Sequence, residues 1–182
     1  LFLVIGFIIF DNNKIVSTIT LDINPSIEIN LTRNEKVKSV VALNEDAKEI
    51  VNGNLKGKSI DDTLKQITDN LIEKGYVAEE NFLEIILYSE GDISNKELET
   101  KLKETLEKKK IDSNITTIEK VSKEDEELAK KYDVSPAKIS YIKSIIKDNE
   151  NINIEDLSNK SVSELNETKA TGKYCDKGYT LE

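Results

Sequence analysis

Histidine is absent from this 182-residue sequence, and cysteine occurs only once, as Cys175. The lack of histidine excludes most common zinc sites and the familiar Ser-His and Cys-His nucleophile pairs. A single cysteine allows no internal disulfide. The seven glycines are scattered, so the chain has no glycine-rich phosphate loop. We therefore expect no metal, no cofactor and no conventional metallo- or nucleotide enzyme.

Negatively charged residues outnumber positively charged ones. The formal net charge is −9 and the sequence pI is about 4.8. This balance argues against a nucleic-acid surface and against binding to an anionic membrane surface. With 37% hydrophobic residues, the chain is long enough to bury a core, either as one domain or as a domain with small appendages.

The most informative stretch surrounds the peptide bond between Asn24 and Pro25. Apolar residues fall on odd positions on both sides of it, which predicts strands with one buried and one polar face. A straight strand over the whole stretch, residues 15–31, would be roughly three times the usual length of 5–6 residues. Proline cannot donate to a sheet ladder, and it pushes the preceding residue into an extended conformation. We therefore predict a bend at Pro25, with Asn24 held extended.

This geometry permits one particular backbone cleavage. The nitrogen of Pro25 carries no hydrogen, so ordinary asparagine deamidation is blocked. The side-chain nitrogen of Asn24 can instead attack its own main-chain carbonyl, close a succinimide ring and expel Pro25 as an amine. Four neighbours could support proton transfer: Asp22 and Glu28 as acids or bases, and Ser26 and Thr20 as hydrogen-bond partners.

Two alternatives remain open on the residues alone. Ser26 could attack the bond before itself, Pro25–Ser26, and the fragment masses would distinguish that reaction. The run Asp-Ile-Asn-Pro-Ser could also be only a bulge or turn, because Asn and Ser bond locally to the backbone and proline fixes φ.

Several motifs of the chain, in order, resemble one known family. The sequence is similar to the extracytoplasmic middle domain of RsgI-type anti-sigma factors from about residue 14 to 168. The matching runs are 21–28 (LDINPSIE), 37–48 (VKSVVALNEDAK), 56–59 (KGKS), 73–76 (EKGY) and 134–138 (VSPAK).

The resemblance implies a function that the composition alone does not. Members of that family cross the membrane once and hold a sigma factor through a cytoplasmic N-terminal domain, which is missing here. They cleave themselves between the Asn and Pro of the signature, which correspond to Asn24 and Pro25. The fragments stay paired until they are separated, and a site-2-type intramembrane protease then frees the sigma factor. The resemblance implies single-turnover self-cleavage and no enzyme in the usual sense.

The organisation of the chain can be predicted from the same observations. Leu1–Phe10 is apolar apart from Gly6, but it is shorter than the roughly 20 residues that cross a bilayer. We interpret it as the outer end of a single transmembrane helix, with a short buried strand as the alternative. We expect four segments: 1–13 as that membrane end, 14–121 as an α+β self-cleaving domain, 122–168 as a helical extension, and 169–182 as a disordered, partly vector-derived tail.

The predicted fold class is α+β. Strands are expected over 15–31, 37–43, 82–88 and 115–121, and helices begin at the N-cap residues Ser59, Ser94, Ser122 and Ser135. We expect helices to cover one face of a mostly antiparallel sheet, similar to SEA-like self-cleaving domains, with a small C-terminal helical subdomain packed on it.

Two other functions stay open at this point. The chain could be a membrane-proximal spacer that does not cleave itself, or an extracellular domain that binds a ligand. A spacer predicts one mass under all conditions, whereas self-cleavage predicts two.

Overall fold

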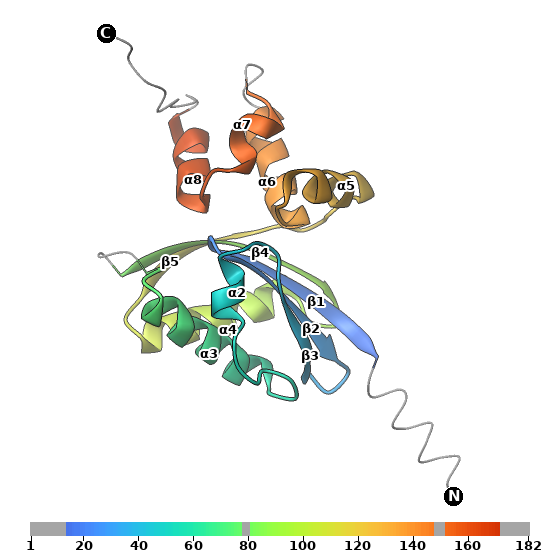
Figure 1. Ribbon diagram of the computed structural model, residues 1–182, viewed down its shortest axis with the longest axis vertical. Helices are drawn as coiled ribbons and strands as arrows, with labels where there is room; N and C mark the ends of the chain where they lie inside the picture. The colour runs from blue at the N-terminus through green and yellow to red at the C-terminus, as the bar shows by residue number, and fades with distance from the viewer. Residues whose placement is uncertain (1–13, 78–80, 148–151, 172–182) are drawn as a thin grey trace, which may run out of the picture.

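The computed structural model describes residues 14–77, 81–147 and 152–171. Within these ranges the chain forms one five-stranded sheet with the strand order β3-β2-β1-β4-β5 (Figure 1). The strands are β1 (Ile15–Asp22), β2 (Ser26–Thr32), β3 (Val37–Ala42), β4 (Phe82–Gly91) and β5 (Asp112–Thr117). Only β5 runs parallel to its neighbour, so the sheet is mostly antiparallel. The predicted α+β class is confirmed.

The first strand of the chain lies at the centre of this sheet. β1 pairs with β2 on one side and with β4 on the other, and both pairings are antiparallel. Its residues Ile19 and Leu21 are fully buried. A strand that is bonded on both edges is held by two ladders as well as by the apolar contacts of its buried side chains.

Helices cover both faces of the sheet (Figure 1). One layer contains α2 (Ala47–Ile50), α3 (Ile60–Glu73) and α4 (Asn95–Lys108). The opposite layer contains α5 (Lys123–Tyr132), α6 (Pro136–Lys147), α7 (Ile154–Ser158) and α8 (Val162–Thr171). The sequence predicted helices on one face. The second layer occupies the other face, on which β1 and β2 carry their polar residues.

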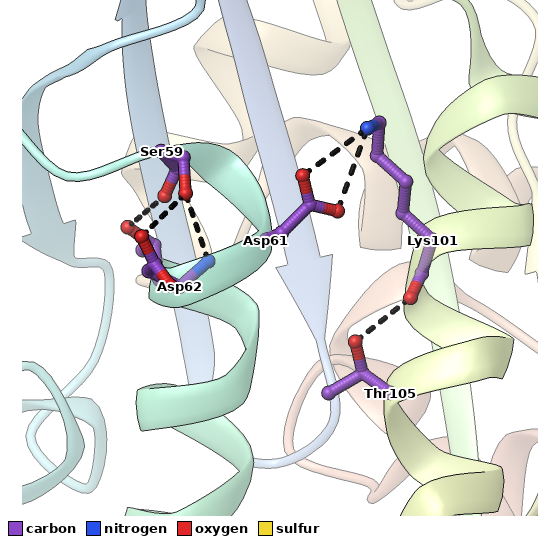
Figure 2. Close-up of polar contacts among 6 residues, drawn as sticks. Ser59, Asp61, Asp62, Lys101 and Thr105 are labelled. Carbon is purple, nitrogen blue, oxygen red and sulfur yellow. Dashed lines mark hydrogen bonds and ion pairs between the residues drawn. The ribbon is translucent and has the colours of Figure 1, made fainter.

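The helix after β3 and α2 begins as its sequence predicts. The Ser59 hydroxyl accepts the backbone N–H of Asp62 at 3.2 Å and so caps α3 (Figure 2). Lys101 of α4 reaches Asp61 of α3 at 3.3 Å and ties the two helices together (Figure 2). The carboxylate of this ion pair is well exposed, so the pair adds little stability. The position of α4 is stabilised mainly by burial of its leucine stripe, at Leu98, Leu102 and Leu106, which packs into the core beneath the sheet.

The second layer has a smaller core of its own. Ile86 of β4 contacts an apolar cluster from α6, α7 and α8 that includes Ile142, Leu157 and Leu165. α6 also contacts β1, so it lies over the central strands.

Some boundaries differ from the expectations. β5 begins at Asp112 and ends at Thr117, three or four residues earlier than predicted. α8 continues to Thr171, so the chain is helical past residue 169, where an unstructured tail was expected. The predicted membrane end, 1–13, and Cys175 lie outside the described residues. Among the helices that are described, none is both long enough and apolar enough to cross a bilayer.

Candidate functional site

The bond between Asn24 and Pro25 lies in a tight three-residue turn. β1 ends at Asp22 and β2 begins at Ser26, and these two residues face each other in the ladder. The Ile23 N–H donates to the Pro25 carbonyl at 2.9 Å and closes the turn. No cis peptide bond occurs among the described residues, so the Asn24–Pro25 bond is trans. The bend predicted at Pro25 is therefore a full chain reversal.

The backbone of Asn24 is not extended, and that prediction was wrong. Its φ is 65°, in the left-handed region, and its side chain is exposed. The reason is the short connection: three residues reverse a twisted ribbon only if one of them adopts positive φ, and asparagine tolerates this better than most residues. Left-handed backbone at a residue other than glycine costs roughly 1–3 kcal/mol. The bond after Asn24 thus follows a strained residue.

The hairpin brings the predicted supporting residues onto one face of the sheet. Thr20 lies opposite Glu28, and Asp22 lies opposite Ser26. The sequence pattern places them in two groups on either side of a bend, and the antiparallel pairing merges those groups. Thr20, Asp22 and Ser26 are buried, whereas Glu28 is half-buried. Three of these polar side chains are thus buried beside a turn whose central residue, Asn24, is exposed.

Asp22 is the unusual member of this group. It is only 1% exposed, and its Oδ2 accepts a hydrogen bond from the hydroxyl of Ser135 in the second helical layer. Its Oδ1 is buried and has no hydrogen-bond partner within the described part of the chain. Burial raises the pKa of Asp22 above its ordinary value of 3.8, although Ser135, Ser26 and Lys138 act in the opposite direction. A carboxyl group in this environment can hold a proton at a pH where an exposed one cannot.

Lys138, near the start of α6, is the positive charge that acts on this carboxyl group. It is only 7% exposed. Burial lowers the pKa of Lys138 below 10.5, while Asp22 and Glu164 oppose that shift. A buried lysine is rare unless it is paired with an opposite charge, and Asp22 provides that charge here.

Asn44 fixes the other side of the turn. Its Oδ1 accepts the N–H of Ser26 at 3.2 Å and the N–H of Ala47 at 3.1 Å. Leu43 donates its N–H to the Ser26 carbonyl at 2.9 Å. The residue that follows Pro25 is therefore held in place by the connection between β3 and α2.

The carboxylate of Glu28 is hydrogen-bonded away from the turn. Its Oε1 accepts a hydrogen bond from the Asn30 side chain at 2.7 Å, and Asn30 in turn accepts from Thr18 at 2.9 Å. This network lies further along the hairpin from the turn. Of the two predicted carboxyl groups, Asp22 is thus the better placed to act at the Asn24–Pro25 bond.

Sequence reasoning missed Ser135, Lys138 and Asn44 as parts of this site. The sequence identifies Ser135 only as an N-cap. One available signal was the third helical position of α6, where Lys138 stands instead of the acidic residue found at that position in the other capped helices. No group of His, Cys, Asp and Glu side chains suited to a metal ion occurs within the described ranges.

Comparison with known proteins shows the family to which the chain belongs. Residues 16–144, from β1 into α6, match the family described as the anti-sigma factor RsgI-like central domain. The chain belongs to this family. The match includes the turn, Asp22, Asn44, Ser135 and Lys138, so the RsgI-like central domain contains every residue of the site.

Individual RsgI relatives match over most of the chain. It is 33% identical over 155 residues to the anti-sigma-I factor RsgI of Bacillus subtilis. It is 27% identical over 169 residues to RsgI7 and 26% identical over 166 residues to RsgI6, both anti-sigma-I factors of Acetivibrio thermocellus. These matches cover 79%, 90% and 84% of this chain, but only 38%, 31% and 22% of the relatives. The chain therefore spans well under half the length of each of these relatives.

Proposed function

We propose that this RsgI-like domain cleaves its own backbone between Asn24 and Pro25 and that the two fragments remain associated. The observation that carries the proposal is the turn itself: a strained Asn24 at φ 65° precedes the proline, and a buried carboxyl group lies two residues away. Near-attack geometry and strain both lower the barrier to an intramolecular reaction.

The reaction balances without a cofactor. Nδ2 of Asn24 forms a bond to the main-chain carbonyl carbon of Asn24, and the bond from that carbon to the Pro25 nitrogen breaks. One proton leaves Nδ2, and one proton reaches the proline nitrogen, which becomes a free amine. The succinimide at the new C-terminus then opens by addition of water. Asn24 is exposed, so water has access to the product.

We assign the proton exchange to Asp22. A base must accept the proton from Nδ2 and an acid must protonate the leaving nitrogen, and one carboxyl group can do both in turn. Because its pKa is raised, Asp22 can change protonation state at a pH closer to neutral than an ordinary aspartate can. Ser26 and Thr20 are assigned supporting roles on the same buried face.

The position of β1 supports continued association after cleavage. Scission after Asn24 leaves β1 on the membrane side of the break, still paired with both β2 and β4. Ile19 and Leu21 remain fully buried, and each such side chain contributes roughly 1.5–3 kcal/mol. The fragments can therefore stay together without the covalent bond.

The proposed role in the cell rests on the RsgI relatives, which are named as anti-sigma-I factors. In this role the domain lies outside the membrane of a single-pass protein whose cytoplasmic part holds a sigma factor. Separation of the fragments would expose the membrane segment to a site-2-type protease and release the sigma factor. No nucleic-acid partner is proposed for the domain.

Intact-protein mass spectrometry with and without denaturant tests the proposal. In denaturant, the wild-type chain should give two masses, and the larger fragment should begin at Pro25. Asn24→Ala should give one mass. Asn34→Ala, at the next hairpin turn, is the matched control and should still give two. A larger fragment beginning at Ser26 would favour attack by the serine, and a single wild-type mass would favour the non-cleaving spacer.

A further inference from the structure

One polar contact between the second helical layer and the sheet joins residues that are far apart in the sequence. Ser135 is fully buried, and its hydroxyl donates to Oδ2 of Asp22, 113 residues away. The same hydroxyl oxygen accepts the backbone N–H of Lys138 at 2.9 Å and so caps α6. One hydroxyl group thus links the start of α6 to the carboxyl group beside the turn.

This cap differs from the others in the chain. Four caps bond an acidic residue of their own helix, three positions on: Ser59 with Asp62, Ser122 with Asp125, Asn153 with Asp156, and Ser161 with Glu164. At α6 that position holds Lys138. The acidic partner of the Ser135 hydroxyl comes instead from β1, as Asp22. The cap of α6 is therefore completed by the residue next to the cleavage turn.

A stabilising role alone does not account for this arrangement. Burial of a carboxyl group beside a lysine generally contributes little net stability compared with apolar residues of similar size. Oδ1 of Asp22 is also buried, and within the described part of the chain only the Ser26 side chain is close enough to offset the cost of its burial. The arrangement does two other things: it fixes Oδ2 of Asp22, and it leaves Oδ1 available at a position two residues before the Asn24–Pro25 bond.

We propose that Ser135 and Lys138 are positioning residues for cleavage of the Asn24–Pro25 bond, so that α6 of the second helical layer is part of the cleavage site. The inference rests on the proposed function. Ser135 orients the Asp22 carboxyl group, and the positive charge of Lys138 sets how readily that group exchanges a proton. Neither residue touches the reacting atoms; both act through Asp22.

The electrostatic effect of each residue has a defined sign. The groups that act on Asp22 are Ser26 of β2 and Ser135 and Lys138 of α6, and Glu164 of α8 acts on Lys138. The hydrogen bond from Ser135 and the charge of Lys138 both lower the pKa of Asp22 against the larger effect of burial. Loss of either one should therefore raise that pKa further. Any limb of the cleavage pH profile that Asp22 governs should move to higher pH, whichever protonation state is active.

The experiment measures the rate of self-cleavage in the full chain. Cell-free translation with a short isotopic pulse provides uncleaved protein at time zero, and denaturing gels follow its conversion at several pH values. Ser135→Ala and Lys138→Met should each slow cleavage by about tenfold or more, because small misplacements of reacting groups have effects of this size. Both should also shift the pH profile to higher pH. Ser135→Thr and Lys138→Arg keep the hydroxyl and the charge, and should restore most of the rate.

Two matched controls come from the same helical layer. Ser122→Ala removes a serine cap from α5, and Lys143→Met removes a lysine from α6 that pairs with Glu124 and Asp125. Both should cleave at the wild-type rate with the wild-type pH profile. If Ser135→Ala fails to fold, as judged by circular dichroism and resistance to protease, the pH profile of Lys138→Met decides the question.

The outcomes separate the two proposals. If the wild type cleaves but Ser135→Ala and Lys138→Met match it in rate and pH profile, the positioning role is overturned and the proposed function stands. If the wild type does not cleave at all, the proposed function fails and this inference fails with it.

Discussion

Gly91, at the end of β4, lies against the backbone of Val16 in β1. A Cβ atom at Gly91 would come within 1.9 Å of the Val16 carbonyl oxygen and 2.7 Å of the Ser17 Cα. Backbone atoms cannot move aside as a flexible side chain can, so no other residue fits here without displacing β1. Glycine at this point is therefore part of what holds the first strand in the sheet.

Gly91→Ala should loosen the N-terminal fragment after cleavage. Overpacking of this kind typically costs about 1–3 kcal/mol, which corresponds to about tenfold weaker association or more. A tag on the N-terminal fragment would hold the cleaved pair on a resin, and retention of the large fragment would be measured at increasing urea. Gly75→Ala is the control, because Gly75 also has positive φ, at 77°, but a Cβ there meets nothing within 4 Å. Equal retention of the two variants would contradict this role of Gly91.

Ser17→Ala should weaken the same association by a different route. The buried Ser17 hydroxyl oxygen accepts the backbone N–H groups of Asp92 and Ile93, at 2.9 and 3.2 Å. Alanine would leave the buried Ile93 N–H without this acceptor, at a cost of about 1–3 kcal/mol, whereas the Asp92 N–H keeps the Val16 carbonyl at 3.3 Å. The resin assay should show earlier loss of the large fragment. Ser39→Ala, on β3, does not touch β1 and should leave retention unchanged.

Asn24→Gly and Asn24→Ala should both abolish cleavage but differ in stability. Both lack the amide nucleophile, and only glycine adopts a φ of 65° without strain. The glycine variant should be more stable than the alanine variant by about 1–2 kcal/mol in urea unfolding. The same pair of substitutions at Asn34, which is not among the residues with positive φ, should not favour glycine. Alanine equal to glycine at position 24 would argue against strain at the scissile bond.

Asp22→Asn should change how stability depends on pH. The pKa of Asp22 is raised by burial, so its contribution to stability is present below about pH 3.8 and is lost as the pH rises through its folded pKa. Asparagine does not titrate. In the uncleaved Asn24→Ala background, the Asp22→Asn variant should gain stability relative to its parent between pH 4 and 8. Urea unfolding across that range measures the free energy of unfolding of each variant. The difference between the two variants removes the contributions of groups that titrate equally in both.

Asp61→Asn is the control for this pH series. Asp61 is mostly exposed and paired with Lys101 on the surface, so its removal should have only a small effect on stability. A stability difference for Asp22→Asn that does not change with pH would show that this carboxyl group is not perturbed in the folded state.

Much of the fold can be predicted from local patterns in the sequence. Alternating apolar residues correctly predicted the strands on both sides of Pro25 and the face that they bury. The N-cap residues Ser59, Ser94 and Ser122 correctly predicted where three helices begin. These signals are local because hydrogen-bond geometry and side-chain periodicity act over a few residues.

The parts that local patterns could not predict depend on distant segments. Thr20 and Asp22 alternate with apolar residues, a pattern typical of solvent-facing positions, yet a second helical layer covers them. The hydrogen bond between Ser135 and Asp22 joins a helix and a strand that only the folded topology brings together. The positive φ of Asn24 was missed because the conformational preference before proline yields to the demand of a three-residue reversal. The resemblance to the RsgI family pointed to the Asn24–Pro25 pair and to its neighbours Asp22, Ser26 and Glu28, but it assigned no role in cleavage to Asn44, Ser135 or Lys138.

The central place of β1 also makes its withdrawal hard to undo. Departure of the strand would separate the β2–β3 pair from the β4–β5 pair, open two unpaired backbone edges at once and expose the apolar side chains that Ile19 and Leu21 had covered. The remaining fragment could not close that gap with its own strands. If the domain is cleaved as proposed, separation of the fragments would therefore be a one-way event, and each molecule could respond to a stimulus only once.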